Sequence, residues 1–161
     1  MSSPTNRSEW EQLAKSLTIN GNAMITGVYQ SAQSGETFDC ISPVDGRMLA
    51  KVASCDYQDA NMAVANAKAV FEAGTWSQLP PVKRKAVMIR FAELLEQNAD
   101  ELALLETLDM GKPIQFAKAV DVAGAARAIR WCGEAIDKIY DEIAPTAHNE
   151  IGMITREPVG V

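Results

Sequence analysis

Several features that identify common protein classes are missing from this chain of 161 residues. No apolar run approaches the ~20 residues that a membrane-spanning helix needs, so we predict no membrane partner. The net charge is −6, and the one basic cluster, residues 83–85, fits a solvated helix face better than a phosphate-binding surface. We therefore also predict no nucleic-acid partner, and the polar residues at the start show no secretory signal.

Residues that carry metal or nucleophile chemistry are scarce as well. The one histidine, His148, lies in a polar stretch, and a single histidine excludes a metal site built on several. The chain has three cysteines, Cys40, Cys55 and Cys132. Their odd number and wide spacing argue against a disulfide framework and favour a location in the reducing cytoplasm. Cys40 and Cys132 fall among apolar neighbours and are expected to be packed and inert. Cys55, just before a helix start, is the strongest of three weak nucleophile candidates.

The glycines do not form a nucleotide-binding motif. None of the ten glycines makes a GxG pair, so the dinucleotide fingerprint GxGxxG is absent. The tripeptide GKP at residues 111–113 ends like a phosphate-binding loop, but Glu106 and Pro113 stand where that loop needs a glycine and a hydroxyl. Composition and spacing therefore predict a helix-rich α+β chain and no activity.

Hydrophobic periodicity and turn residues predict the order of the elements. In chain order they are a helix with a capping box at residues 8–11, a hairpin turn at 20–22, two or three antiparallel strands within 28–52, helices beginning at Asp56, Pro81 and Asn98, a stop at 111–113, one long helix over 116–143, and a strand-like segment after Pro145. In the helix that begins at Pro81, Val87, Phe91 and Leu94 form an apolar stripe. The small residues 123–126 should let another element come very close.

Three motifs, in this order, change the interpretation. They are SPVDG at residues 42–46, ELALLETLDMGKP at 101–113 and REPVGV at 156–161. Together they resemble the aldehyde dehydrogenase superfamily, and the resemblance runs from about residue 18 to residue 161. AARAIRW at 125–131 and EAIDK at 134–138 are similar to bacterial enzymes of polyamine and putrescine degradation, the γ-glutamyl-γ-aminobutyraldehyde and 4-guanidinobutyraldehyde dehydrogenases.

The resemblance implies a fold class and a domain organisation. The full family fold is α/β with a Rossmann-like cofactor domain, and this part of it is helix-rich with an N-terminal β-hairpin and a C-terminal β-arm. Residues 1–143 would belong to the cofactor domain, 144–158 to an arm that joins subunits into a homodimer or homotetramer, and 159–161 to the start of a cofactor-domain strand. Val159 and Val161, which resemble the beginning of a buried strand, lead us to expect a truncated chain.

The resemblance also implies a chemistry. Family members oxidise aldehydes to carboxylates through a cysteine thioester, with NAD or NADP as the acceptor. The family's nucleophile, general base and nucleotide-binding strands would follow residue 161, so residues 1–161 alone are expected to be inactive. Asp121 and Gly124 match positions near the mouth of the family's substrate tunnel. Cys40 and Asp109 match positions whose backbone oxygens hold a structural monovalent cation in some members.

An alternative without catalysis stays open at this stage. A truncated product could act as a helical interaction module, and a monomer of 161 residues that melts sharply would favour that hypothesis. A molten or aggregating chain would favour a missing remainder instead, because unpaired apolar edges promote association.

Overall fold

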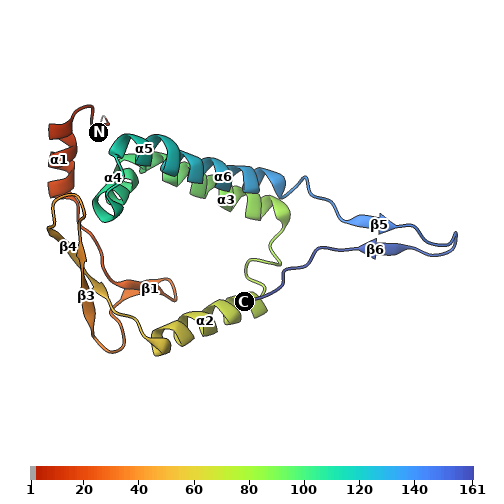
Figure 1. The fold of residues 1–161 in the computed structure, drawn as a ribbon. Helices are drawn as coiled ribbons and strands as arrows, with labels where there is room; N and C mark the ends of the chain where they lie inside the picture. The colour runs from red at the N-terminus through yellow and green to blue at the C-terminus, as the bar shows by residue number, and fades with distance from the viewer. Residues whose placement is uncertain (1–2) are drawn as a thin grey trace.

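Helices and three separate two-stranded sheets make up the part of the chain that the computed structural model describes, residues 3–161 (Figure 1). In chain order the elements are α1 (Arg7–Ser16), β1 (Ala23–Ile25), β2 (Val28–Gln30), β3 (Thr37–Ile41), β4 (Met48–Ala53), α2 (Tyr57–Glu72), α3 (Pro81–Gln97), α4 (Ala99–Met110), α5 (Ile114–Phe116), the π-helical η1 (Ala117–Val122), α6 (Ala123–Ala135), β5 (Glu142–Ala144) and β6 (Gly152–Ile154). The strand pairs β1–β2, β3–β4 and β5–β6 are all antiparallel. The expected helix-rich chain with small β-hairpins is confirmed, and no helix in the described range is long and apolar enough to cross a membrane.

The first helix begins earlier than the sequence predicts. Asn6, and not Ser8, is the N-cap, and its side chain accepts a hydrogen bond of 3.1 Å from the backbone N–H of Glu9. The Glu9 carboxylate in turn accepts from the backbone N–H of Thr5 at 2.6 Å. The capping box predicted at residues 8–11 is therefore wrong, because the acidic residue that reaches back over the helix start is Glu9.

The start of α2 agrees with the prediction and also ties two segments together. Asp56 caps the helix, and the Asp59 side chain accepts from the backbone N–H of Asp56 at 3.1 Å, which completes a capping box. The other oxygen of Asp59 accepts from the backbone N–H of Gln33 at 3.0 Å. Asp59 is only 1% exposed, so one buried carboxylate holds the loop before β3 against the start of α2.

Residues 20–22 do not form the predicted hairpin turn. The turn between β1 and β2 lies at Thr26 and Gly27, both with positive φ, at 57° and 82°. Residues 20–22 instead run beside β4, where the Gly21 carbonyl accepts from the backbone N–H of Ala53 at 2.8 Å. A Cβ at Gly21 would lie 2.0 Å from the carbonyl oxygen of Lys51, so this glycine permits close packing of two backbones.

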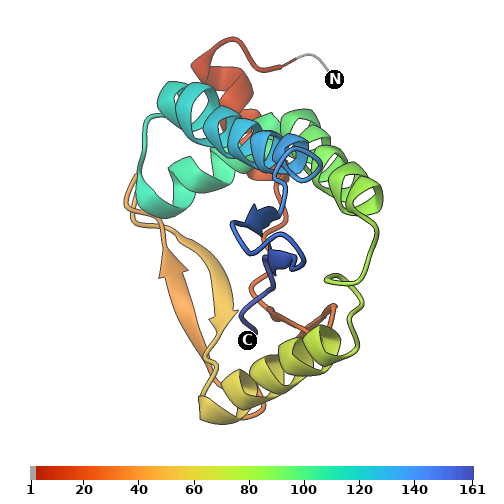
Figure 2. The ribbon, with the colours of Figure 1, turned by 90° about the vertical axis from the view of Figure 1, so that its right-hand side faces the viewer.

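The helices α3 and α6 pack side by side (Figure 2). Ala92 and Ala126 are 0% and 1% exposed, and a Cβ at Gly133 would lie 2.8 Å from the Cβ of Met88. The predicted stripe of α3 is not the contact face, since Phe91 is 49% exposed and Val87 and Leu94 are exposed too. Small residues bring the helix axes close together, and the larger apolar side chains of α3 remain without cover in the described chain.

The long helix predicted over residues 116–143 is interrupted and ends early. It consists of α5, the π-helical η1 and α6, which ends at Ala135. The backbone N–H groups of Lys138 and Ile139 both bond to the Ala135 carbonyl, which closes the helix in a turn. Ile143, placed on the helix by its spacing, belongs to β5 and is 77% exposed. The apolar residues keep their helical spacing of three or four positions beyond the end of α6, and this spacing by chance included a residue of the following strand.

The strands β5 and β6 form an arm that projects away from the helices (Figure 1). The strand-like pattern predicted after Pro145 is thereby confirmed, although the arm begins at Glu142, two residues before the predicted bound of 144. His148 is exposed and lies in the connection between the two strands, as its polar neighbours in the sequence indicated. The three residues 159–161 form no strand here, and Val159 and Val161 are exposed.

Candidate functional site

Two of the recognised sequence motifs meet in space where the β3–β4 turn contacts the end of α4. Gly111 ends α4 with φ of 79°, a left-handed conformation that favours glycine, as predicted. A Cβ on Gly111 would lie 3.1 Å from Cγ of Pro43 in the turn. The turn itself is closed by a bond of 2.9 Å from the Gly46 N–H to the Ser42 carbonyl. The motifs SPVDG and GKP are thus the two sides of one tight contact.

Cys40 and Asp109 also come together at this junction. The Cys40 thiol donates to Oδ1 of Asp109 at 3.1 Å, from β3 to α4. This hydrogen bond to a carboxylate raises the pKa of the Cys40 thiol, because ionisation would place two negative charges side by side. Both residues border a cavity of about 320 Å³ beside the 20–22 segment. A protonated, half-buried thiol is a poor nucleophile, so the packed and inert role predicted for Cys40 fits its surroundings.

The possible ligand atoms around the contact of Cys40 with Asp109 agree only in part with a cation site. The pairing of β3 with β4 shifts register after Cys40 and skips Leu49, and such a bulge leaves backbone groups outside the ladder. Backbone oxygens released in this way suit a hard monovalent cation. Within residues 3–161, however, no three side chains of His, Cys, Asp or Glu gather as they would around a metal ion. The two predicted positions are brought together, and their role as ligands stays a prediction.

The π-helical segment η1 forms two ion pairs, one with α4 and one with the loop that follows α4. Lys118 meets Oδ1 of Asp100 at 2.5 Å, and Asp121 meets the ammonium of Lys112. The pairing with Lys118 lowers the pKa of Asp100 although burial of the carboxyl opposes it. π-helical turns are rare and often occur at functional sites, and the sequence carried no signal for this one. One consequence is clear: the carboxylate of Asp121 is already neutralised by a neighbour.

Asp121 and Gly124 lie three residues apart and so share one side of the helix that η1 and α6 continue. A Cβ added at Gly124 would make only an ordinary contact, since its nearest atom would be Nη2 of Arg127 at 3.9 Å. The close approach predicted for residues 123–126 is found at Ala126, which is buried. Gly124 itself is half-buried, and the Arg127 guanidinium lies beside it.

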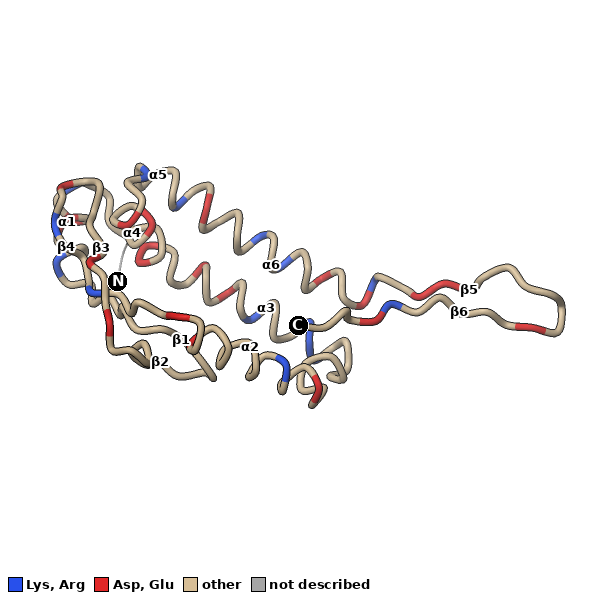
Figure 3. The backbone as a smooth tube through the Cα atoms, turned by 60° about the horizontal axis from the view of Figure 1, so that its bottom comes forward, with Lys and Arg blue, Asp and Glu red and all other residues tan. Residues whose placement is uncertain are grey.

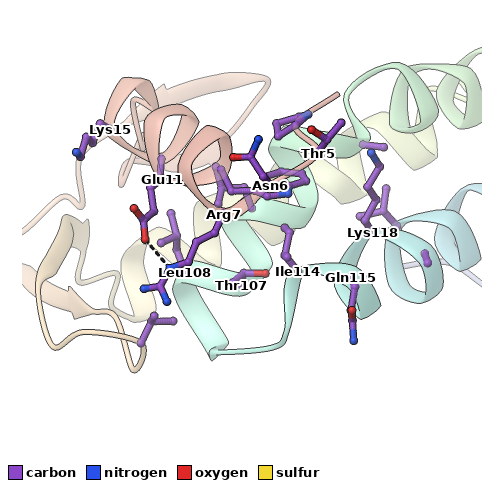
Figure 4. A pocket seen from close by; sticks show the side chains of 18 of the residues that line it. Thr5, Asn6, Arg7, Glu11, Lys15, Thr107, Leu108, Ile114, Gln115 and Lys118 are labelled. Atoms are coloured by element: carbon purple, nitrogen blue, oxygen red, sulfur yellow. Dashed lines mark hydrogen bonds and ion pairs between the residues drawn. The ribbon is translucent and has the colours of Figure 1, made fainter. Parts of the chain in front are cut away.

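A cavity of about 1240 Å³ lies elsewhere, between α1, the β3–β4 turn, α4 and η1 (Figure 4). Trp10, Leu104, Leu108 and Val122 contribute apolar walls. The ammonium of Lys118 lies 5.8 Å from the centre of the Trp10 ring. Neither Asp121 nor Gly124 borders it. The sequence carried no signal for this cavity, because it depends on contacts between distant elements.

The remaining predicted chemistry is dispersed over the surface. Cys132 is exposed, so its prediction as a buried residue is wrong: Ala126 and Gly133 form the buried side of α6 instead. Cys55 is exposed next to the N-cap of α2, as expected. The basic cluster 83–85 is only partly solvated, because Lys85 is 24% exposed and pairs with Glu134 and Asp137 at 3.0 Å. Figure 3 shows such charged residues spaced along α3, α6 and the base of the arm.

The order of these elements and the motifs at their contacts define a known class of protein. Residues 29–161 match the model of the aldehyde dehydrogenase family, and the chain belongs to that family. It is 51% identical over 152 residues to the NADP/NAD-dependent aldehyde dehydrogenase PuuC of Escherichia coli, covering 94% of this chain and 31% of PuuC. It is 43% identical over 155 residues to the aminoacetaldehyde dehydrogenase of Pseudomonas aeruginosa, covering 96% and 31%.

Solved structures agree with the described fold. The indole-3-acetaldehyde dehydrogenase AldA of P. syringae superimposes with a TM-score of 0.95 at 64% identity, over 98% of this chain and 32% of AldA. The γ-glutamyl-γ-aminobutyraldehyde dehydrogenase of Burkholderia cenocepacia gives a TM-score of 0.93 at 53% identity, over 95% of this chain and 31% of that protein. The chain thus spans about a third of the length of these relatives.

Proposed function

We propose that residues 1–161 form the N-terminal part of an NAD(P)-dependent aldehyde dehydrogenase, called the complete enzyme below. The family match over residues 29–161 is the observation that carries this proposal. The complete enzyme would oxidise aldehydes to carboxylates through a cysteine thioester. Its domains would be those expected from the sequence: residues 1–143 in the cofactor domain, 144–158 in an arm and 159–161 at the start of a strand.

The reacting groups would come from other parts of the complete enzyme. Cys40 is held protonated by Asp109, which argues against a nucleophilic role. Within residues 3–161 no glycine-rich turn opens a helix in the way that a dinucleotide phosphate requires, so the described residues do not fit NAD or NADP by themselves. The role of this segment would be structural support and a share of the substrate entrance. Its location in the cytoplasm stays a prediction.

The substrate proposed is an ω-amino aldehyde derived from a polyamine. Aminoacetaldehyde, named for one relative, carries an ammonium group and is a cation. γ-Glutamyl-γ-aminobutyraldehyde, named for another, carries an ammonium and a carboxylate on its glutamyl end, so its net charge is zero. Indole-3-acetaldehyde, named for another, has no charge. Identity to these relatives ranges from 43% to 64%, so similarity alone does not fix the charge of the substrate. Asp121 and Gly124, which has no side chain, are the residues of this segment proposed to lie beside an aldehyde at the tunnel mouth.

The assembly proposed is a homodimer or homotetramer joined through residues 144–158. The arm presents exposed apolar side chains, with Ile151 81% and Met153 74% exposed, and both edges of its two-stranded sheet are unpaired in the described chain. Exposed apolar strands of this kind pair with another chain. In the complete enzyme, Ile151→Asp should therefore lower the oligomer mass measured by light scattering, whereas Val64→Asp on α2 should leave that mass unchanged.

A steady-state assay tests the proposed activity. The complete enzyme should reduce NAD+ or NADP+ in the presence of 3-aminopropanal, followed as absorbance of the reduced nicotinamide. Measuring both cofactors at equal concentration decides which one it prefers. No reduction of either cofactor with amino, aromatic or aliphatic aldehydes would overturn the proposed function.

A further inference from the structure

The carboxylate proposed to meet the substrate is already paired. Oδ2 of Asp121 is shielded from solvent, and its one partner among residues 3–161 is the ammonium of Lys112. The two side chains are 34% and 32% exposed, so water screens the pair less than it screens a surface ion pair. A cation that approaches Asp121 therefore meets two opposite charges with no net attraction.

The fold holds Lys112 at this place. It lies between Gly111, whose N–H bonds to the Thr107 carbonyl at 3.0 Å, and Pro113, whose φ is fixed at −57°. On the other side, Asp121 belongs to η1, which the buried Ala117 anchors against α4. The ion pair thus joins two segments whose backbones are constrained.

The pair still leaves one approach open. Since Oδ2 is buried while 34% of the Asp121 side chain remains exposed, the exposed part is the rest of that side chain. Gly124, one turn further, has no side chain that would cover it, although the guanidinium of Arg127 lies beside Gly124. A ligand can reach Asp121 from this side, where the effective charge it meets depends on Lys112.

We propose that Lys112 is a specificity-determining residue that sets how strongly the site prefers cationic over neutral aldehydes. This inference rests on the proposed function, because it requires Asp121 to lie beside the aldehyde. With Lys112 present the carboxylate is balanced and the site accepts both classes of aldehyde. Without Lys112 the uncompensated carboxylate attracts a cation. Because Lys112 affects substrate binding and does not touch the reacting atoms, its substitution should change KM more than kcat.

Two aldehydes of equal shape isolate the effect of charge. The cation is 4-(trimethylammonio)butanal, and 5,5-dimethylhexanal replaces its nitrogen with carbon. The quantity measured on the complete enzyme is the ratio of kcat/KM for the cation to kcat/KM for the neutral aldehyde. Lys112→Met should raise this ratio about five- to tenfold, mainly through KM, and Asp121→Asn should lower it by a similar factor. The double variant should return to within about twofold of the wild type.

Two variants serve as matched controls. Lys118→Met removes the same charge from the other η1 ion pair, next to Trp10, and should leave the ratio unchanged. Lys112→Arg keeps the charge and should also keep the ratio. If Lys112→Met is active but the ratio does not move, or if activity falls equally for both aldehydes, Lys112 has only a structural role and the inference is overturned. Absence of turnover by the wild type with both aldehydes would overturn the proposed function itself.

Discussion

The α3–α6 pair and the β5–β6 arm are neighbours in the chain but differ in the surface they bury (Figure 1). Ala92 and Ala126 are 0% and 1% exposed between the two helices, and Gly133 leaves no room for a side chain. In the arm, Ile151 and Met153 are 81% and 74% exposed. The helix pair is therefore stabilised by contacts within this chain, whereas the arm presents apolar surface outward.

This difference separates two uses of apolar residues. In the helix pair they fix a distance between backbones, and any added volume must displace a helix. In the arm they contribute little to the stability of the chain itself and are available to a partner. Substitutions in the two regions should therefore differ sharply in their effect on unfolding.

The largest effect is expected at Gly133. Replacement by alanine places a Cβ 2.8 Å from the Cβ of Met88, and overpacking of this kind costs about 2–3 kcal/mol. Gly124→Ala is the matched control in the same helix, where the nearest atom is 3.9 Å away and the gain in helix propensity stabilises by up to ~1 kcal/mol. Urea unfolding of both variants measures the difference. Equal stabilities would show that the α3–α6 contact is not tight.

The next largest effect concerns a buried polar group. Asp59→Ala leaves the backbone N–H groups of Gln33 and Asp56 without their acceptor, which should cost about 1–3 kcal/mol of unfolding free energy. Glu142→Ala, which removes the exposed partner of Arg156 at the base of the arm, should cost less than ~1 kcal/mol. Thermal melts at one pH compare the two. A smaller loss for Asp59→Ala than for Glu142→Ala would contradict the comparison.

Acid should weaken the end of the helix pair. Hydrogen bonds from Lys138 and Lys85 lower the pKa of Asp137 from an ordinary value of 3.8 to about 2. Because the folded pKa is depressed, the stabilisation is complete above the unfolded pKa and disappears as pH falls through the folded one. The difference in unfolding free energy between wild type and Asp137→Asn should thus shrink between pH 4 and pH 2. A difference that does not change over this range would refute the coupling.

The smallest effect on stability is expected in the arm. Ile151→Thr changes a side chain that is 81% exposed, so the unfolding free energy of residues 1–161 should shift by less than ~0.5 kcal/mol. Chemical denaturation of dilute protein measures this without interference from association. A loss above about 1.5 kcal/mol would mean that the arm packs against its own chain.

Local signals in the sequence predicted several helix boundaries, although not the start of α1 or the end of α6. Asp56 caps α2, Pro81 opens α3 and Gly111 ends α4, because each residue acts through its own backbone or its nearest neighbours. Asn98 marks the boundary between α3 and α4, although its side chain bonds back to the Leu94 carbonyl at 2.8 Å instead of capping the helix that follows.

Features that depend on distant contacts were not predictable in the same way. The buried side of α6 follows from Met88 and Ile89 in α3, so spacing alone placed Cys132 on the wrong side. The π-helical η1 has an ordinary helical composition, and its ion pairs with Asp100 and Lys112 become visible only in three dimensions. The family resemblance implied that Cys40 and Asp109, 69 residues apart in the chain, lie near each other, but not the hydrogen bond between their side chains.

The most direct test of the central claim is a parallel assay of the complete enzyme and of residues 1–161, with NAD+ or NADP+ and 3-aminopropanal. The account predicts reduced nicotinamide from the complete enzyme and none above background from residues 1–161. Turnover by residues 1–161 alone would contradict it, because catalysis would then reside in the segment assigned here to support and substrate entry.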